Sequence, residues 1–346
     1  MKKYDLFFLI FILFPFIPKL INCQTQEKEK PFSILISDKD FKKPMSKLNA
    51  EFELIQMKNG MNCLLIYDPF TTVSHIHLET ENGCFTDTTP SISHLVEHMI
   101  FGGSQNYQEV YPLSRTIEGA KLYSGGAITG QTDQEYFYTI AYNFKFDKVL
   151  NVFIDAFKHP LFSEEVIKKE IQIINSEFYL QIDEPYHLID AIIRQLCTNK
   201  TSYYGFTSGN NITLNPDESW AISKKLKSYH NLVNKPENIF FLIYSNQTIK
   251  ELENYAAKYL NYEMYKFPEN ETDKTEEEQL LKNLYKFEQF EIFDDNLYGH
   301  GIFYNSHDRK NYVNIFFHVG DMNLKELQFD AFEYFSYLFK SESLGV

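Results

Sequence analysis

Cysteine is scarce in this sequence, with four cysteines among 346 residues. No two of them lie at chelating distance along the chain, which argues against a cysteine-based metal site. Cys23 ends an apolar N-terminal leader, and Cys63, Cys84 and Cys197 remain in the body of the chain. This odd number allows one disulfide and one free thiol, and the sequence leaves the pairing open.

Positive charge is scarce as well: 33 Lys and Arg stand against 47 Asp and Glu, for a formal net charge of -14. Such an acidic surface argues against nucleic acid or an anionic membrane as the main partner and weakly favours basic peptides. The apolar content of 44% is typical of globular proteins. The length is enough for one large domain or two ordinary ones.

A long apolar run occurs once, at the N-terminus, where Lys2 and Lys3 precede "LFFLIFILFPFI". This pattern predicts a secretory signal peptide over residues 1–23. The alternative is a membrane anchor, but Pro15 and Pro18 interrupt the run and it is shorter than the roughly 20 residues of a spanning helix. We therefore expect a secreted protein with no membrane span after cleavage. Four sequons are typical of a glycoprotein: Asn199, Asn211, Asn246 and Asn270.

Strand and helix patterns occur in clusters, which predicts an α+β fold with a largely antiparallel sheet flanked by helices. The polar residues 24–50 are expected to form an N-terminal arm. The Asn-Gly pair at 59–60 separates two apolar runs and predicts a β-hairpin, because both residues tolerate positive φ. Further strands are expected at 73–80, 135–142 and 238–245, and helices at 91–102, 109–118, 145–158, 163–182, 187–196 and 248–259.

The pattern changes again near the C-terminal end. An acidic linker without apolar periodicity is expected at 266–283, after a first domain at 45–262. Residues 285–346 are expected to form a partial second domain of similar type, because one strand-helix pair is too little for a core.

The stretch "SHLVEHMIF" places His94, Glu97 and His98 within five residues. Positions i and i+4 of a helix share a face, so both imidazoles can bind one ion. Glu97 beside them has the chemistry of a base that takes a proton from metal-activated water. The H-x-x-E-H order is the inverzincin motif. The alternative is a helix with a solvated polar face, which apolar neighbours oppose: Leu95, Val96, Met99, Ile100 and Phe101.

A catalytic zinc takes three protein ligands, and "EEVIKKEIQIINSEFYLQ" offers two further carboxylates. Glu170 and Glu177 are seven residues apart, two turns along one face, in a seam with Val166 and Ile173. Carboxylates beside core residues are costly unless they are paired or coordinated. The alternative is that both glutamates lie at the solvent margin of the apolar stripe.

Together these residues resemble the insulinase-type (pitrilysin, M16) zinc metallopeptidases, in which a helix with E-x6-E follows H-x-x-E-H nearly eighty residues later. Here Glu177 lies 79 residues beyond His98 (177 minus 98). The resemblance implies that His94, His98 and Glu177 bind one Zn²⁺, that Glu97 is the general base, and that Glu170 supports the site. It covers about residues 50–260, including "NGMNCLLIYDP", "EHMIFGGSQNY" and "HPLFSEEVIKKE".

Two local departures from the family pattern concern the substrate strand and the start of the motif helix. Family members usually carry Asn-Ala-x-Thr on an edge strand that pairs with extended substrate. The stretch here is Gly126-Ala127-Ile128-Thr129, so backbone pairing is expected to persist without the asparagine side chain. A small deletion in "TDTTPSIS" is expected to alter the start of the helix that carries His94.

The resemblance implies a secreted zinc metalloendopeptidase that hydrolyses peptides or small proteins, with zinc-bound water activated by Glu97. Family members usually enclose substrate between two similar halves, so a second half or subunit is an expected partner. The alternative is a catalytically weak or inactive zinc- or peptide-binding relative, or a subunit of a larger assembly. Gly126 and the missing second half motivate this alternative.

Overall fold

The computed structural model describes residues 30–109, 111–112, 116, 122–141, 145–182, 184–198, 206–263, 266–267 and 293. The chain divides into two compact units, Met1–Ile302 and Phe303–Val346, and the described residues belong to the first. The predicted signal peptide lies outside them. Apart from a few positions, the same holds for the predicted helix at 109–118, for the acidic linker and for the partial second domain.

A seven-stranded sheet forms the centre of the described structure, in the order β1-β2-β3-β7-β4-β6-β5. The strands are β1 (Phe32–Ile36), β2 (Glu51–Met57), β3 (Asn62–Tyr67), β4 (Val73–Thr80), β5 (Leu122–Thr129), β6 (Gln134–Ala141) and β7 (Ile239–Ser245). β3 and β7 pair in parallel, and every other neighbouring pair is antiparallel. The predicted α+β class with a largely antiparallel sheet is confirmed.

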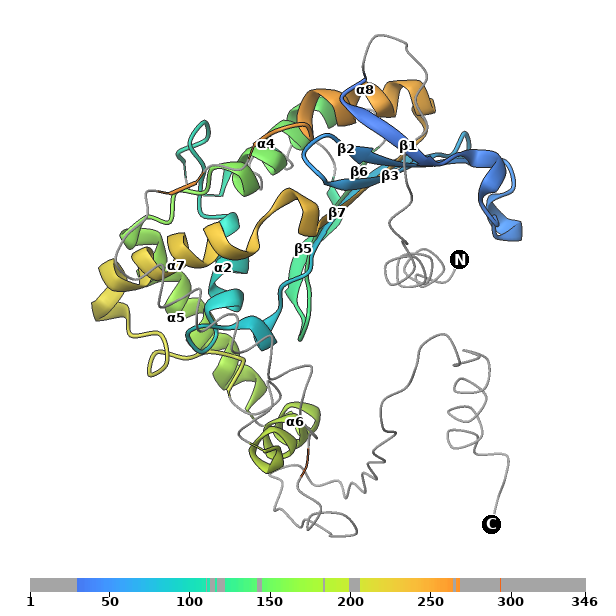
Figure 1. Cartoon of the computed structure of the whole chain (residues 1–346). Helices are drawn as coiled ribbons and strands as arrows, with labels where there is room; N and C mark the ends of the chain where they lie inside the picture. Colours follow the sequence, from blue (N-terminus) through green and yellow to red (C-terminus); the bar gives the residue numbers. More distant parts are fainter. Residues whose placement is uncertain are drawn as a thin grey trace, which may run out of the picture. The chain divides into compact units, whose positions relative to one another are not determined.

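Helices gather on one side of this sheet (Figure 1). They are α2 (Ile92–Ile100), α4 (Phe146–Lys158), α5 (Glu164–Gln181), α6 (Pro185–Leu196), α7 (Ser219–Val233) and α8 (Ile249–Tyr259). Strand alternation explains the arrangement, because Ile76 and Leu78 of β4 join the helices in one core whereas His77 points to the other face. Edge-to-face packing of Tyr136 against Phe157, with ring centres 4.5 Å apart, joins the sheet to α4.

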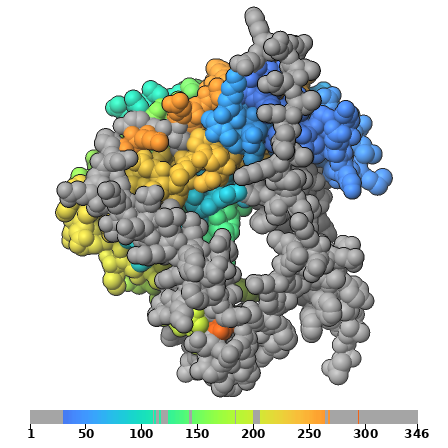
Figure 2. Space-filling view, in the orientation of Figure 1, coloured from blue at the N-terminus to red at the C-terminus, as the bar shows by residue number. Residues whose placement is uncertain are grey.

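The predicted hairpin is present between β2 and β3. Gly60 has φ +94°, a conformation that favours glycine. The Asn59 side chain donates hydrogen bonds of 2.7 and 2.8 Å to the carbonyls of Leu260 and Tyr262. The hairpin tip is thereby held at the end of α8, and Figure 2 shows orange α8 against the blue N-terminal strands.

The structure differs from the prediction in two elements. β1 falls within residues 24–50, predicted as an arm, and extends the sheet by pairing with β2. α7 was not predicted, because small polar residues interrupt its apolar pattern; Ser223 and Ser228 are nevertheless buried. In the part of the chain that the structure describes, no helix is both long and apolar enough to cross a membrane.

Candidate metal centre

Helix α2 carries the H-x-x-E-H motif and presents it on one side. The motif residues His94, Glu97 and His98 are partly exposed, whereas the remaining residues of α2 are buried. The start of α2 is unusual, because Ser91 has φ +68° and the Asp87 carboxylate accepts hydrogen bonds from the backbone N–H groups of Ser91 and Ser93. This aspartate thereby satisfies two N–H groups at the start of the helix.

Helix α5 carries the two glutamates. Val166, Glu170 and Ile174 face the core, and Glu170 is only 2% exposed. The glutamates were predicted to alternate with the core residues Val166 and Ile173 along one face of α5. This prediction is wrong for Ile173, which is 40% exposed. The alternative that both lie at the solvent margin is wrong for Glu170, because this carboxylate is buried with two hydrogen-bond donors.

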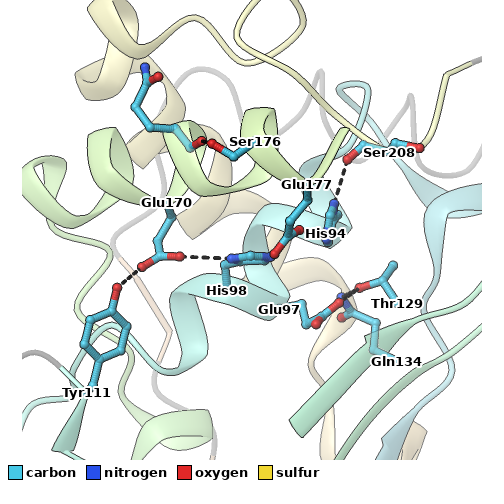
Figure 3. Close-up of polar contacts among 11 residues, drawn as sticks. His94, Glu97, His98, Tyr111, Thr129, Gln134, Glu170, Ser176, Glu177 and Ser208 are labelled. Atoms are coloured by element: carbon cyan, nitrogen blue, oxygen red, sulfur yellow. Dashed lines mark hydrogen bonds and ion pairs between the residues drawn. The ribbon is translucent and has the colours of Figure 1, made fainter. Parts of the chain in front are cut away.

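α2 and α5 bring three potential ligands together (Figure 3). Glu177 Oε2 lies 3.6 Å from His94 Nε2 and 3.5 Å from His98 Nε2. Within the described residues, His94, His98 and Glu177 are the one group of three or more such side chains whose ligand atoms all lie within 4.8 Å of one another. Ligand atoms around a tetrahedral zinc, at about 2.0–2.1 Å from the ion, are about 3.3 Å apart. The donor set and its spacing therefore fit zinc.

The outer nitrogens of both imidazoles have acceptors. His94 Nδ1 lies 2.7 Å from the carbonyl oxygen of Ser208, and His98 Nδ1 lies 2.9 Å from Glu170 Oε2. Since a carbonyl oxygen can only accept, the proton of a neutral His94 ring resides on Nδ1. Its Nε2 then presents a lone pair towards Glu177, which is the form that binds a metal.

The carboxylates favour positive charge at this site. Burial opposes protonation of His98, but the hydrogen bonds to Glu170 and Glu177 outweigh it and raise the pKa of His98 to about 9. The hydrogen bond from His98 in turn lowers the pKa of Glu177. The Tyr111 hydroxyl donates to the second oxygen of Glu170, so that both of its oxygens are held. A cation held by the three side chains would supply the positive charge that these carboxylates favour.

The loop before α7 is shaped to reach His94. Gly209 has φ +84°, and a side-chain carbon there would lie 2.9 Å from Ile174 Cγ2 of α5. Glycine therefore lets this loop approach α5 closely enough for the Ser208 carbonyl to meet His94.

The edge strand β5 approaches Glu97 from the sheet. Thr129 Oγ1 donates a 2.6 Å hydrogen bond to Glu97 Oε2, and Gln134 Nε2 donates to Thr129 Oγ1 at 3.0 Å. Gly126, where the family resemblance would lead one to expect asparagine, has open space around it: a side-chain carbon there would meet only Phe137 Cζ, at 3.9 Å. Packing does not require glycine at this position. That β5 pairs with substrate remains a prediction.

Three residues of the centre had no signal in the sequence. Tyr111, Gln134 and Ser208 belong to no motif and reach the site from separate segments. Ser208 contributes only a backbone carbonyl, which any residue supplies. A buried glutamate on α5 calls for donors, but the sequence does not say which donors they are.

Comparisons with known proteins point to one family of peptidases. Residues 62–204 match the family model of insulinase (peptidase family M16). The chain is 28% identical over 210 residues to the insulin-degrading enzyme of Drosophila melanogaster, covering 59% of this chain and 21% of that enzyme. It is 24% identical over 247 residues to the Homo sapiens insulin-degrading enzyme, covering 68% and 24%.

A similar fold occurs in the crystal structure of pitrilysin, with a TM-score of 0.63 and 21% identity over 67% of this chain and 24% of that one. The chain thus spans about a fifth to a quarter of the length of these relatives.

Proposed function

Because the chain belongs to the insulinase family of peptidases (M16), we propose that it is a zinc metallopeptidase that cleaves peptides or small proteins. One observation carries the proposal: the Nε2 atoms of His94 and His98 converge on Glu177 Oε2, with Glu97 on the same face of α2. Zinc supplies Lewis acidity when bound, since it polarises a carbonyl oxygen and makes water acidic enough to lose a proton near neutral pH.

The side chains divide the remaining work. His94, His98 and Glu177 hold the ion, and Ser208 and Glu170 fix the orientation of the two imidazole rings. The Glu97 carboxylate accepts the proton of the attacking water and returns it to the leaving amine nitrogen. The hydrogen bond from Thr129 holds one oxygen of Glu97, which limits the rotation of the carboxylate.

Substrate binding is proposed at β5. This strand is the outermost of the described sheet, and its free edge can add an extended peptide as a further strand. Thr129 lies on β5 and contacts Glu97, so a peptide paired with this strand would pass beside the base. A second half or subunit, as in two-halved M16 peptidases, is the proposed partner for enclosing the substrate.

The test is the variant Glu97→Gln in the full chain, loaded with zinc and assayed on a library of quenched fluorescent peptides. Glutamine keeps the shape and can still accept from Thr129, but it cannot take a proton. Losing a general base lowers the rate by about 10²–10⁴-fold, while bound zinc should stay near one per chain because Glu97 is not a ligand. Glu165→Gln, an exposed change on α5, is the matched control. Equal cleavage by wild type and Glu97→Gln would refute the mechanism.

A second candidate is a zinc- or peptide-binding relative without catalysis. Gly126 favours it, because the asparagine is missing although the structure has room for a side chain there. Wild-type protein that holds one zinc per chain, binds library peptides and cleaves none of them would support this candidate over the peptidase.

We propose a secretory location from the N-terminal pattern of charge and apolar residues. Asn211 is compatible with glycosylation on that route, because it is exposed in a turn after the loop that reaches His94.

A further inference from the structure

A buried glutamine connects the metal-binding helix to the residue that holds the proposed base. Gln134 begins β6, and its Nε2 donates hydrogen bonds of 2.6 Å to the backbone carbonyl oxygen of Ser93 and 3.0 Å to Thr129 Oγ1. Thr129 Oγ1 in turn donates a 2.6 Å hydrogen bond to Glu97 Oε2. Figure 3 shows Gln134 and Thr129 beside Glu97. A chain of hydrogen bonds therefore runs from α2 through the sheet and back to α2.

The Ser93 carbonyl oxygen fixes the direction of every bond in this chain. A carbonyl oxygen can only accept, so the Gln134 atom 2.6 Å from it must be the amide nitrogen. With the amide turned over, two acceptors would face each other there. The second hydrogen of this nitrogen points to Thr129 Oγ1, which leaves the hydroxyl hydrogen of Thr129 for Glu97. The backbone of α2 thus decides where that hydrogen points.

The surroundings of Gln134 indicate that donation is what its amide contributes. The residue is 1% exposed, and within the described structure its Oε1 is buried without a hydrogen-bond partner. An unsatisfied buried oxygen lowers stability, and an apolar side chain of similar shape would avoid that cost. The two N–H groups are therefore the property that distinguishes glutamine from methionine at this position.

Thr129 lies where its hydroxyl has competing acceptors. It is half-buried on β5, the outermost strand of the described sheet. Solvent water and the backbone carbonyls of a paired peptide can both accept from a hydroxyl at such an edge. Because Thr129 Oγ1 accepts from Gln134, fewer directions remain for its own hydrogen, and the direction to Glu97 is the one that the structure shows.

We propose that Gln134 is a positioning residue for the base, because it orients the Thr129 hydroxyl towards Glu97. This inference rests on the proposed role of Glu97 in peptide hydrolysis. Glu97 Oε2 is held as an acceptor, so Oε1 is the oxygen that takes the proton of the attacking water and returns it to the leaving amine. Gln134 itself touches neither the metal ligands nor the substrate in this scheme and acts through Thr129.

The test is a double-mutant cycle in the full chain loaded with zinc, with kcat and KM measured on a cleaved peptide. Gln134→Met keeps the length of the side chain and removes both donors. It should lower kcat about 3- to 10-fold and change KM less than about twofold. In a Thr129→Val background the same change should lower kcat by less than about twofold more, because the two residues act as one unit. Gln56→Met, at an exposed glutamine of β2, is the matched control.

Two kinetic outcomes would overturn the proposal. One is a folded Gln134→Met protein with the kcat of the wild type. The other is an equal loss of kcat with and without Thr129→Val, which is expected if Gln134 only fastens α2 to the sheet. Failure of the proposed mechanism is distinguishable, because Glu97→Gln would then cleave as fast as the wild type. If Gln134→Met does not fold, Gln134→Asn replaces it, since the shorter amide cannot reach both acceptors.

A second measurement needs neither activity nor a variant. In an assigned nuclear magnetic resonance spectrum of the ¹⁵N-labelled wild-type chain, both side-chain amide protons of Gln134 should exchange with solvent about 100-fold more slowly than those of Gln56. Both are buried and hydrogen-bonded, and exchange then requires local opening. Rapid exchange of either Gln134 proton would show that the amide does not hold both acceptors, and would overturn the proposal even if the chain cleaved no peptide.

Discussion

Replacing Glu170 by glutamine should weaken zinc binding although Glu170 is not a ligand. Its two oxygens accept from His98 Nδ1 and the Tyr111 hydroxyl, and the side chain is buried. Glutamine has only one side-chain oxygen, so its amide group must face one of these donors. One hydrogen bond to a charged group is lost, at about 1.5–3 kcal/mol. Since about 1.4 kcal/mol corresponds to tenfold, the Kd for zinc should rise about 10- to 150-fold.

The assay is competition for zinc against a chromophoric chelator at constant pH, with circular dichroism to check the fold. Tyr111→Phe removes the other hydrogen bond and keeps the carboxylate, so a smaller effect of a few-fold is expected. Glu165→Gln lies on the same helix, where Glu165 pairs with Lys169 on the surface, and should change nothing. A folded Glu170→Gln protein whose Kd is within twofold of wild type would show that Glu170 does not hold His98 for the metal.

Three other changes test the buried histidine, the loop glycine and the base. Burial lowers the pKa of His230 to about 4 from about 6.5 in an unfolded chain. The free energy of unfolding is therefore unaffected by this group above pH 6.5, and it decreases by about 2 kcal/mol at pH 5 because the unfolded chain binds the proton more readily. The urea midpoint should fall less between pH 7 and 5 in His230→Gln than in the wild type. Gly209→Ala forces a side chain into a left-handed backbone against Ile174 and should cost about 1–3 kcal/mol in urea unfolding; an unchanged midpoint would contradict the strain. Thr129→Val removes the hydrogen bond to Glu97 and should lower kcat about tenfold at equal zinc content, with Thr129→Ser as the hydroxyl-retaining control.

The local patterns of the sequence predicted most helices and strands because apolar periodicity reports which face is buried. The hairpin at Asn59 and the metal helix α2 are both present. α7 was missed because its buried face includes serines and His230. Burial of such residues depends on neighbours from other segments, and periodicity in one segment does not contain that information.

The three proposed ligands lie together in the structure, yet the surroundings of the site were not predictable from sequence. Spacing along α5 placed Glu170 and Glu177 on one side of the helix, but it did not decide which one is buried. That depends on how α5 packs against α2. The partners Tyr111 and Ser208 come from loops, whose paths follow from tertiary packing.

The position of β7 has a consequence for how the chain is made. β3 and β4 are close in sequence but are not paired, because β7 lies between them. β7 follows β4 by about 160 residues, so at typical synthesis rates the ribosome delivers it on the order of 10–30 s later. Until then the inner edges of β3 and β4 have no partner from the central strand, and both strands are exposed to aggregation. The proposed metal ligands are thus synthesised before β7, but the sheet behind them closes only when β7 is inserted.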